Sequence, residues 1–201
     1  MRIQWEHGRK GEREIMRKIV AVIGDAKIDR PSHKFDVAFE TGKLLVDNGF
    51  RVQSGGHGGV MAAAFEGAHS SAKYREGDTI AILPGFKADN GNEWGDICIP
   101  TGLDLYRNAI VAGASAVIAV GGGAGTLSEI SFAWTFRRLI IAYDCVDGWS
   151  SKVAGTKLDN KFRYPFEDKI FAASTPDEAI KILLEKMPLY VSDYTGIRFG
   201  E

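Results

Sequence analysis

Short runs of β-branched and other apolar residues alternate with segments of helical spacing along most of this sequence. Ser32 and Thr175 are suited to cap the N-termini of two of these helices. The strand-like runs lie at residues 19–23, 50–53, 79–83, 97–99, 116–120, 139–143 and 170–172, and the helical segments at 32–47, 60–71, 103–113, 126–136 and from 175 onward. Such alternation builds βαβ units with right-handed crossovers and a parallel sheet covered on both faces. The pattern therefore predicts an α/β fold, a Rossmann-like doubly wound parallel sheet of about seven strands.

Length and composition favour one globular domain. The chain has 201 residues, of which 45% are hydrophobic and 25% charged, enough to bury a full core. There is no second core, internal repeat or linker in the pattern. We expect the Rossmann-like domain at residues 18–187, a charged N-terminal extension at 1–17 and a C-terminal tail at 188–201.

Charge and cysteine content exclude several classes of protein. A net charge of −1 argues against a general nucleic-acid binder, which would carry a basic surplus. The first 18 residues lack the apolar segment of a signal peptide, and no apolar run has the length of a membrane span. Cys98 and Cys145 are isolated and lie in strand-like runs, which predicts buried free thiols in a reducing compartment. The sequence thus predicts a cytoplasmic protein without membrane or nucleic-acid partners.

Glycine is concentrated in two short clusters. Of the 24 glycines, eight lie at residues 55–59 and 121–125. Each cluster ends a predicted strand and precedes a predicted helix, where free backbone N–H groups and the helix dipole favour an anion such as phosphate. The alternative is that these glycines only make tight turns and close packing. Two clusters at equivalent junctions favour a phosphorylated small molecule.

Two common phosphate-binding motifs are excluded. Neither cluster supplies the lysine of a Walker A motif. The first predicted strand is followed by Gly24-Asp25, which lacks the Gly-x-Gly-x-x-Gly of dinucleotide-binding proteins. No histidine or cysteine spacing is typical of a metal site.

Three side chains near the clusters each have two interpretations. The spacing Thr126-x-x-Glu129 is that of a helix capping box, although a carboxylate here could also face the phosphate and stabilise a cationic, sugar-like transition state. Spacing alone favours the cap. Arg107 is either a surface residue or a guanidinium that projects towards the second cluster. His57 is either a ligand contact or an exposed loop residue.

Both clusters resemble the signatures of a known family. Residues 54–61, Ser-Gly-Gly-His-Gly-Gly-Val-Met, resemble its Gly-Gly-Gly-x-x-Gly-Leu-Met stretch, and residues 121–129 resemble its Pro-Gly-Gly-x-Gly-Thr-x-x-Glu signature. This is the family long labelled "possible lysine decarboxylase". It includes the Lonely guy cytokinin-activating phosphoribohydrolases and molybdenum-cofactor carrier proteins. The resemblance covers residues 18–145.

The resemblance implies a Rossmann-like homodimer that binds a nucleoside 5′-monophosphate. Enzymes of the family cleave its N-glycosidic bond to a free base and ribose 5-phosphate. The family's catalytic arginine and glutamate fall on Arg107 and Glu129. No pyridoxal site is visible, so the decarboxylase label gains no support. The residues expected to bind nucleotide and phosphate are Gly24, Gly55, Gly56, Gly58, Asn108, Gly122, Gly123, Gly125 and Thr126.

The sequence departs from the hydrolases at three points. Gly121 replaces proline, Asn108 replaces a frequent lysine, and Gly24-Asp25 replaces Gly-Ser-Ser. A carboxylate after the first strand would repel a phosphate. These departures indicate the carrier-type branch. Two hypotheses stay open: a phosphoribohydrolase, or a carrier or sensor that binds a nucleotide or a pterin-type cofactor phosphate without cleaving it.

Overall fold

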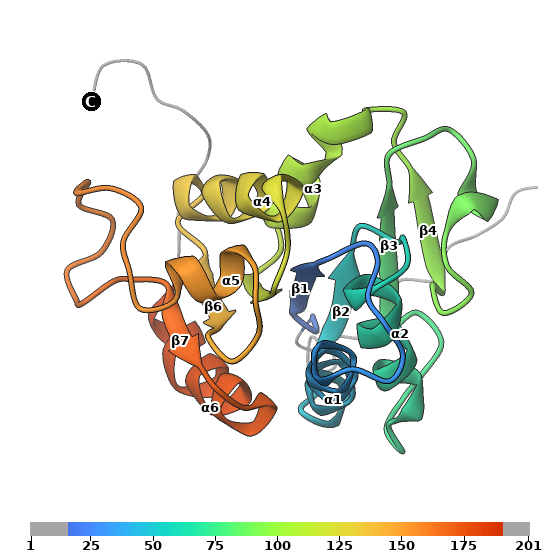
Figure 1. Cartoon of the computed structure of the whole chain (residues 1–201), viewed down its shortest axis with the longest axis horizontal. Coiled ribbons are helices and arrows are strands. Elements are labelled where there is room, and N and C mark those ends of the chain that lie inside the picture. The colour runs from blue at the N-terminus through green and yellow to red at the C-terminus, as the bar shows by residue number, and fades with distance from the viewer. Residues whose placement is uncertain (1–15, 191–201) are drawn as a thin grey trace, which may run out of the picture.

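The computed structural model describes residues 16–190. Within them, seven parallel strands form one sheet in the order β4-β3-β2-β1-β5-β6-β7 (Figure 1). The predicted charged extension and tail lie largely outside the described residues. The strands are β1 (Ile19–Gly24), β2 (Arg51–Ser54), β3 (Thr79–Leu83), β4 (Ile97–Pro100), β5 (Ala116–Val120), β6 (Leu139–Tyr143) and β7 (Phe171–Ala173).

Strand β1 is central, and the chain changes direction across it. It pairs with β2 on one side and with β5 on the other, with Ala21 opposite both Gln53 and Val117. Strands β2–β4 extend the sheet in one direction and β5–β7 in the other. The point where strand order reverses therefore lies between β1 and β5, which is where doubly wound folds bind their ligands.

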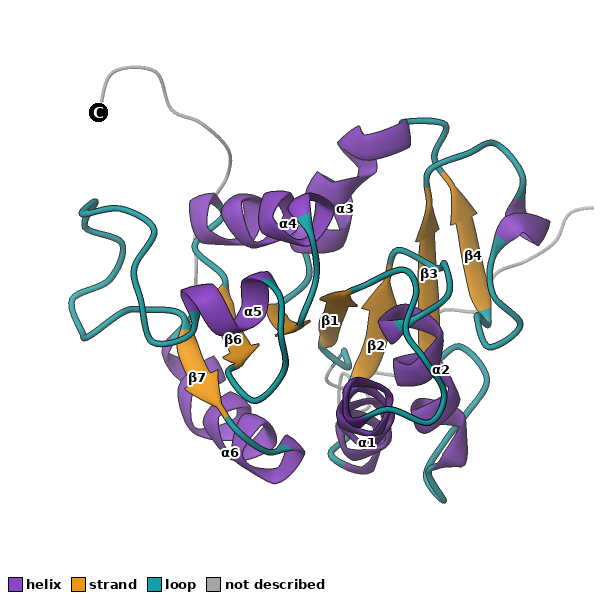
Figure 2. Ribbon diagram, viewed as in Figure 1, coloured by secondary structure: helices purple, strands orange, loops and turns teal. Residues whose placement is uncertain are grey.

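Helices cover both faces of the sheet, as Figure 2 shows. Alternate residues of each strand enter two separate cores: Val20 and Ile118 pack with α1, α2 and α6, whereas Ala21 and Val117 pack with α3, α4 and α5. The predicted α/β doubly wound fold is confirmed. The helices are α1 (His33–Asp47), α2 (Val60–Ser70), α3 (Asn108–Ala112), α4 (Ala124–Thr135), α5 (Trp149–Val153) and α6 (Pro176–Lys186).

Two predicted helix starts are confirmed at atomic detail. The Ser32 hydroxyl accepts a hydrogen bond from the N–H of Phe35, and that of Thr175 accepts one from the N–H of Glu178. Other boundaries differ. Where a helix over residues 103–113 was predicted, a 3₁₀ turn (Asp104–Arg107) precedes the five-residue α3. Helix α5 lies in a region predicted to be loop. The five-residue α5 is too short to display helical periodicity in sequence.

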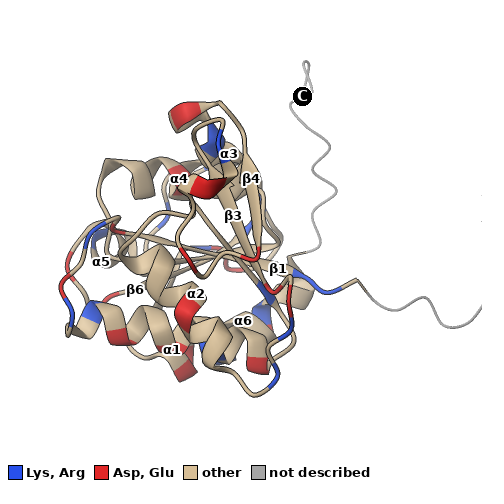
Figure 3. Cartoon of the chain, turned by 90° about the vertical axis from the view of Figure 1, so that its right-hand side faces the viewer, with Lys and Arg blue, Asp and Glu red and all other residues tan. Residues whose placement is uncertain are grey.

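The ends of the described chain are anchored to the domain. The Arg17 guanidinium bonds to the Asp78 carboxylate at 2.5 Å and to the Phe50 carbonyl at 3.0 Å. At the other end, the Tyr190 hydroxyl donates to Asp168 at 2.5 Å. No helix among these residues is long and apolar enough to cross a membrane. In the view of Figure 3, acidic and basic residues are interspersed along the elements.

Candidate functional site

Three loops meet at the carboxyl ends of β1, β2 and β5. The Asp25 carbonyl, just after β1, accepts a hydrogen bond from the N–H of Val60 at the start of α2. The Asp25 carboxylate accepts one from the N–H of Gly122, between β5 and α4, at 2.9 Å. The sheet thus brings both glycine clusters against the loop that follows its central strand (Figure 1).

Close packing requires glycine at two of these positions. A Cβ on Gly24 would lie 2.3 Å from the Val120 carbonyl oxygen. Gly59 has a φ of +64°, and a Cβ there would lie 2.2 Å from the Asp25 carbonyl oxygen. Both contacts are with backbone, which cannot move aside cheaply. The first cluster therefore holds the loops together at least as much as it offers room for a ligand.

Arg107 is buried against the first cluster. Its guanidinium covers Gly55 so closely that a Cβ on this glycine would lie 2.4 Å from Nη2. Its Nη1 donates to Glu129 Oε1 at 3.0 Å, and both residues are less than a tenth exposed. The structure thus brings together Gly55, Arg107 and Glu129 from three separate elements, and the surface interpretation of Arg107 is wrong.

Glu129 does not cap helix α4. The N-cap is Gly123, without any side-chain cap hydrogen bond, and the helix begins at Ala124, two residues before the predicted start. Glu129 therefore lies in the second turn and bonds to Arg107 instead, so the capping-box interpretation is wrong. Burial raises the pKa of Glu129 to about 7, and the Arg107 guanidinium opposes this rise.

The N-terminus of α4 is open. Gly123, Ala124 and Gly125 are exposed, and a Cβ on either glycine would meet no protein atom within 4 Å. Within the described part of the chain, the N–H groups of residues 123–126 have no hydrogen-bond acceptor. Free N–H groups at a helix N-terminus, reinforced by the helix dipole, favour an anion.

The inner half of the second cluster is already occupied by protein groups. The N–H of Gly121 donates to Ser150 Oγ at 2.8 Å, and that of Gly122 donates to Asp25. Gly148 packs against them: a Cβ on it would lie 2.6 Å from the Gly121 carbonyl carbon. Sequence reasoning missed Ser150 and Gly148, since both lie beyond the motif: Gly148 is the N-cap of α5, and Ser150 lies in the first turn of that helix.

Lys34 compensates the Asp25 carboxylate. Its Nζ donates to Asp25 Oδ2 at 2.7 Å and lies 3.0 Å from Asp147 Oδ1. Although burial lowers the pKa of Lys34, hydrogen bonds to these two carboxylates raise it overall. The carboxylate expected from the sequence to be repulsive is therefore paired within the protein with a lysine that sequence reasoning did not single out, and this lysine is shared with Asp147.

The other predicted residues have more varied surroundings. The Asn108 amide donates to Ser128 Oγ at 2.8 Å and to the Gly125 carbonyl at 3.4 Å, so it ties α3 to the start of α4. Gly58 is exposed, and Thr126 is buried beneath Gly122. Burial and the positive charge of Arg107 lower the pKa of His57. Among residues 16–190, no cluster of three metal-ligating side chains occurs.

A separate cavity lies away from this site. It has a volume of about 290 Å³ beneath the loop before β7, and its lining includes Trp134, Lys157, Phe162 and Arg163. The Arg163 guanidinium stacks on Trp134, with 3.8 Å between Cζ and the ring centroid. None of the residues predicted from the glycine clusters lines it.

Known proteins resemble this chain in both sequence and structure. The cytokinin riboside 5′-monophosphate phosphoribohydrolase LOG of Oryza sativa subsp. japonica is 30% identical over 134 residues, which span 64% of this chain and 53% of the rice protein. The molybdenum cofactor binding protein of the phototrophic bacterium Rippkaea orientalis is 29% identical, with a TM-score of 0.70 over 85% of this chain and 98% of that protein.

The molybdenum cofactor carrier protein of Chlamydomonas reinhardtii is 25% identical, with a TM-score of 0.66 over 86% of this chain and 99% of that protein. The relation to both LOG and molybdenum-cofactor carriers, predicted from the glycine motifs, is confirmed. The model of the SLOG cluster4 family matches residues 17–180. This chain therefore belongs to the SLOG cluster4 family.

Proposed function

We propose that this protein binds a nucleoside 5′-monophosphate at the switch point between β1 and β5 and hydrolyses its N-glycosidic bond. The observation that carries the proposal is the buried Arg107–Glu129 pair, joined at 3.0 Å. Glu129 lies on α4, the helix whose N-terminal N–H groups at residues 123–126 are open, and Arg107 reaches it from the 3₁₀ turn before α3. A structural ion pair would not need this position next to unpaired backbone donors. The likeness to the rice phosphoribohydrolase supports the same reaction.

In the proposed binding mode, the phosphate lies on the N–H groups of residues 123–126, and Gly123 and Gly125 leave room for it. The ribose then lies towards Glu129. The negative charge of Glu129 stabilises the oxocarbenium-like transition state and orients a water molecule. Arg107 holds Glu129 and steadies the leaving base.

The bond changes are those of a simple hydrolysis. The water oxygen bonds to C1′ as the C1′–N bond breaks, and one proton of the water passes to the Glu129 carboxylate. The base leaves with the electron pair and takes up a proton from solvent. The products are the free base and ribose 5-phosphate.

Replacement of Glu129 tests this mechanism directly. We expect Glu129→Gln to lower kcat/KM for AMP and related monophosphates by about 10²- to 10⁴-fold, measured by release of free base. Because the ionised carboxylate is needed and its pKa is raised to about 7, wild-type kcat/KM should increase with pH up to about 7 and then level off. Full activity of the glutamine variant, or no cleavage of any monophosphate by the wild type, would contradict the mechanism.

The second candidate is a carrier or sensor that binds a nucleotide or a pterin-type cofactor phosphate without cleaving it. The likeness to two molybdenum-cofactor proteins over nearly their whole length favours it. Under this proposal the same backbone donors hold the phosphate, and Arg107 and Glu129 serve only to shape the pocket. Native mass spectrometry of freshly purified protein would detect a co-purified ligand, whereas rapid turnover of a monophosphate would favour the enzyme.

We further propose that the protein is a cytoplasmic homodimer. Its cysteines are free thiols, compatible with a reducing compartment.

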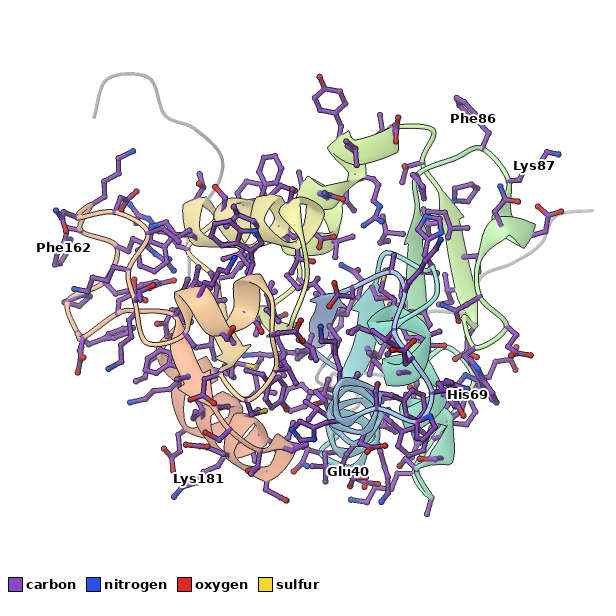
Figure 4. All side chains as sticks on the ribbon, viewed as in Figure 1. Glu40, His69, Phe86, Lys87, Phe162 and Lys181 are labelled. Atoms are coloured by element: carbon purple, nitrogen blue, oxygen red, sulfur yellow. The ribbon has the colours of Figure 1, made fainter. Side chains whose placement is uncertain are left out.

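The proposed dimer contact is a group of exposed apolar side chains on both sides of Arg107 in the sequence. Leu105 and Tyr106 are 71% and 82% exposed, and Ile110 is 44% exposed. Phe86, which projects outward in Figure 4, packs over Gly102 in the same region. Contact between two copies at this surface would bury these side chains and enclose one side of the site. Sedimentation equilibrium should then give twice the chain mass.

A further inference from the structure

Asp25 places a carboxylate inside the second glycine cluster. Its Oδ2 accepts hydrogen bonds from the Gly122 N–H at 2.9 Å and from Lys34 Nζ at 2.7 Å. The side chain is 29% exposed. Among the described residues, its Oδ1 has no hydrogen-bond donor.

No backbone N–H group is free at Gly121 or Gly122. The two N–H groups donate to Ser150 and Asp25. The two carbonyls accept from the N–H groups of Ser150, at 3.0 Å, and Trp149, at 2.9 Å. Within the second cluster, an anionic ligand therefore finds free N–H groups only from residue 123 onward, and the position before it is occupied by the Asp25 carboxylate.

The charged groups around Asp25 do not make the space beside Gly122 favourable for a second anion. Lys34 is the cation in direct contact, and it is shared with Asp147, whose side chain is 96% exposed. Solvent screens the exposed Asp147 carboxylate, whereas the Asp25 carboxylate lies directly against the Gly122 N–H. A second phosphoryl group next to the first would meet this charge in a partly desolvated setting, where like charges repel strongly.

We propose that Asp25 is a specificity-determining residue that restricts the ligand to a single phosphate group. The site accepts a phosphate monoester and rejects pyrophosphate-containing ligands such as nucleoside diphosphates and dinucleotides. The inference rests on the proposed phosphate position at residues 123–126. Under this proposal, the Asp25 carboxylate does not prevent phosphate binding but discriminates between ligands with one phosphate group and ligands with two.

The test compares carbocyclic analogues of AMP and ADP, which resist cleavage at C1′, by isothermal titration calorimetry of the full chain. For the wild type we expect the monophosphate to bind about tenfold more tightly than the diphosphate. In Asp25→Asn, which keeps an oxygen that can accept from Gly122, this preference should be lost. Asp25→Ser is a second neutral variant, and thermal unfolding verifies that each is folded.

Asp147→Asn is the charge-matched control. It also removes one carboxylate from Lys34 but has no contact with Gly122, so the ratio of the two affinities should stay as in the wild type. Equal affinities in the wild type, or the same change of ratio in Asp147→Asn, would overturn the role of Asp25 while leaving the proposed function intact. If neither analogue binds the wild type, the proposed phosphate site is itself wrong and the inference falls with it.

Discussion

The two glycine clusters both follow strands of the sheet, yet a side chain added at their glycines would meet different surroundings. In the first cluster, an added Cβ on Gly55, Gly56 or Gly59 would lie less than 3.0 Å from another protein atom. In the second, this holds for Gly121 and Gly122, whereas the space beside Gly123 and Gly125 is open. The first cluster is filled by its own protein, and the second is filled only in its inner half.

Although the two clusters look alike in sequence, the first is used for packing within the protein, whereas the outer half of the second is open. Gly59 has to accommodate the Asp25 carbonyl, and Gly55 has to accommodate Arg107. No protein group lies within 4 Å of a Cβ added at Gly123 or Gly125, which is compatible with the phosphate position proposed above. Substitutions in the two clusters should consequently separate stability from ligand binding.

The largest effect is expected for Gly59→Ala. The new Cβ would lie 2.2 Å from the Asp25 carbonyl oxygen, at a φ of +64° and a ψ of −133°, and we expect a loss of about 3 kcal/mol or more in the free energy of unfolding. Gly49→Ala is the matched control, because Gly49 has a φ of +83° with no atom within 4 Å. It should cost only about 1 kcal/mol. Urea denaturation measures both, and equal losses would show that packing at Gly59 is not tight.

A smaller effect, on activity rather than stability, is expected for Gly55→Ala. The Cβ would lie 2.4 Å from Arg107 Nη2, and since the guanidinium is a flexible side-chain end, it should shift and release Glu129 while the fold persists. We expect kcat/KM to fall about 10- to 100-fold with little change in melting temperature. Retention of full activity would mean that the Arg107–Glu129 contact is not needed for the reaction.

The smallest effect on the protein itself is expected for Gly125→Ala. The residue lies in the first turn of α4 with open space around it, so stability should be unchanged or rise by up to about 1 kcal/mol. Affinity for a monophosphate should nevertheless fall about tenfold, because the methyl group takes up space that the phosphate uses. Ser131→Ala, at an exposed position of the same helix, should leave the affinity unchanged. Unchanged affinity in Gly125→Ala would place the ligand elsewhere.

Most of the fold could be predicted from local sequence, and the reasons are visible in particular elements. Strands β5 and β6 are fully buried apolar runs, and the cap of α1 is set by one serine three residues from its partner. The site was harder to predict. Glu129 looked like a cap because its actual partner is 22 residues away. The partners of Asp25 could not be foreseen because Gly122 and Lys34 are 97 and 9 residues away.

The contacts of Ser150 and Gly148 with the second cluster have a consequence for protein engineering. A nine-residue signature transplanted to another α/β scaffold would carry Gly121 and Gly122 but neither the hydroxyl that accepts from Gly121 nor the side-chain-free backbone that packs behind both glycines. The graft would have to include the loop after β6 together with the start of α5, and a search by signature alone would also select chains in which that segment cannot support the turn.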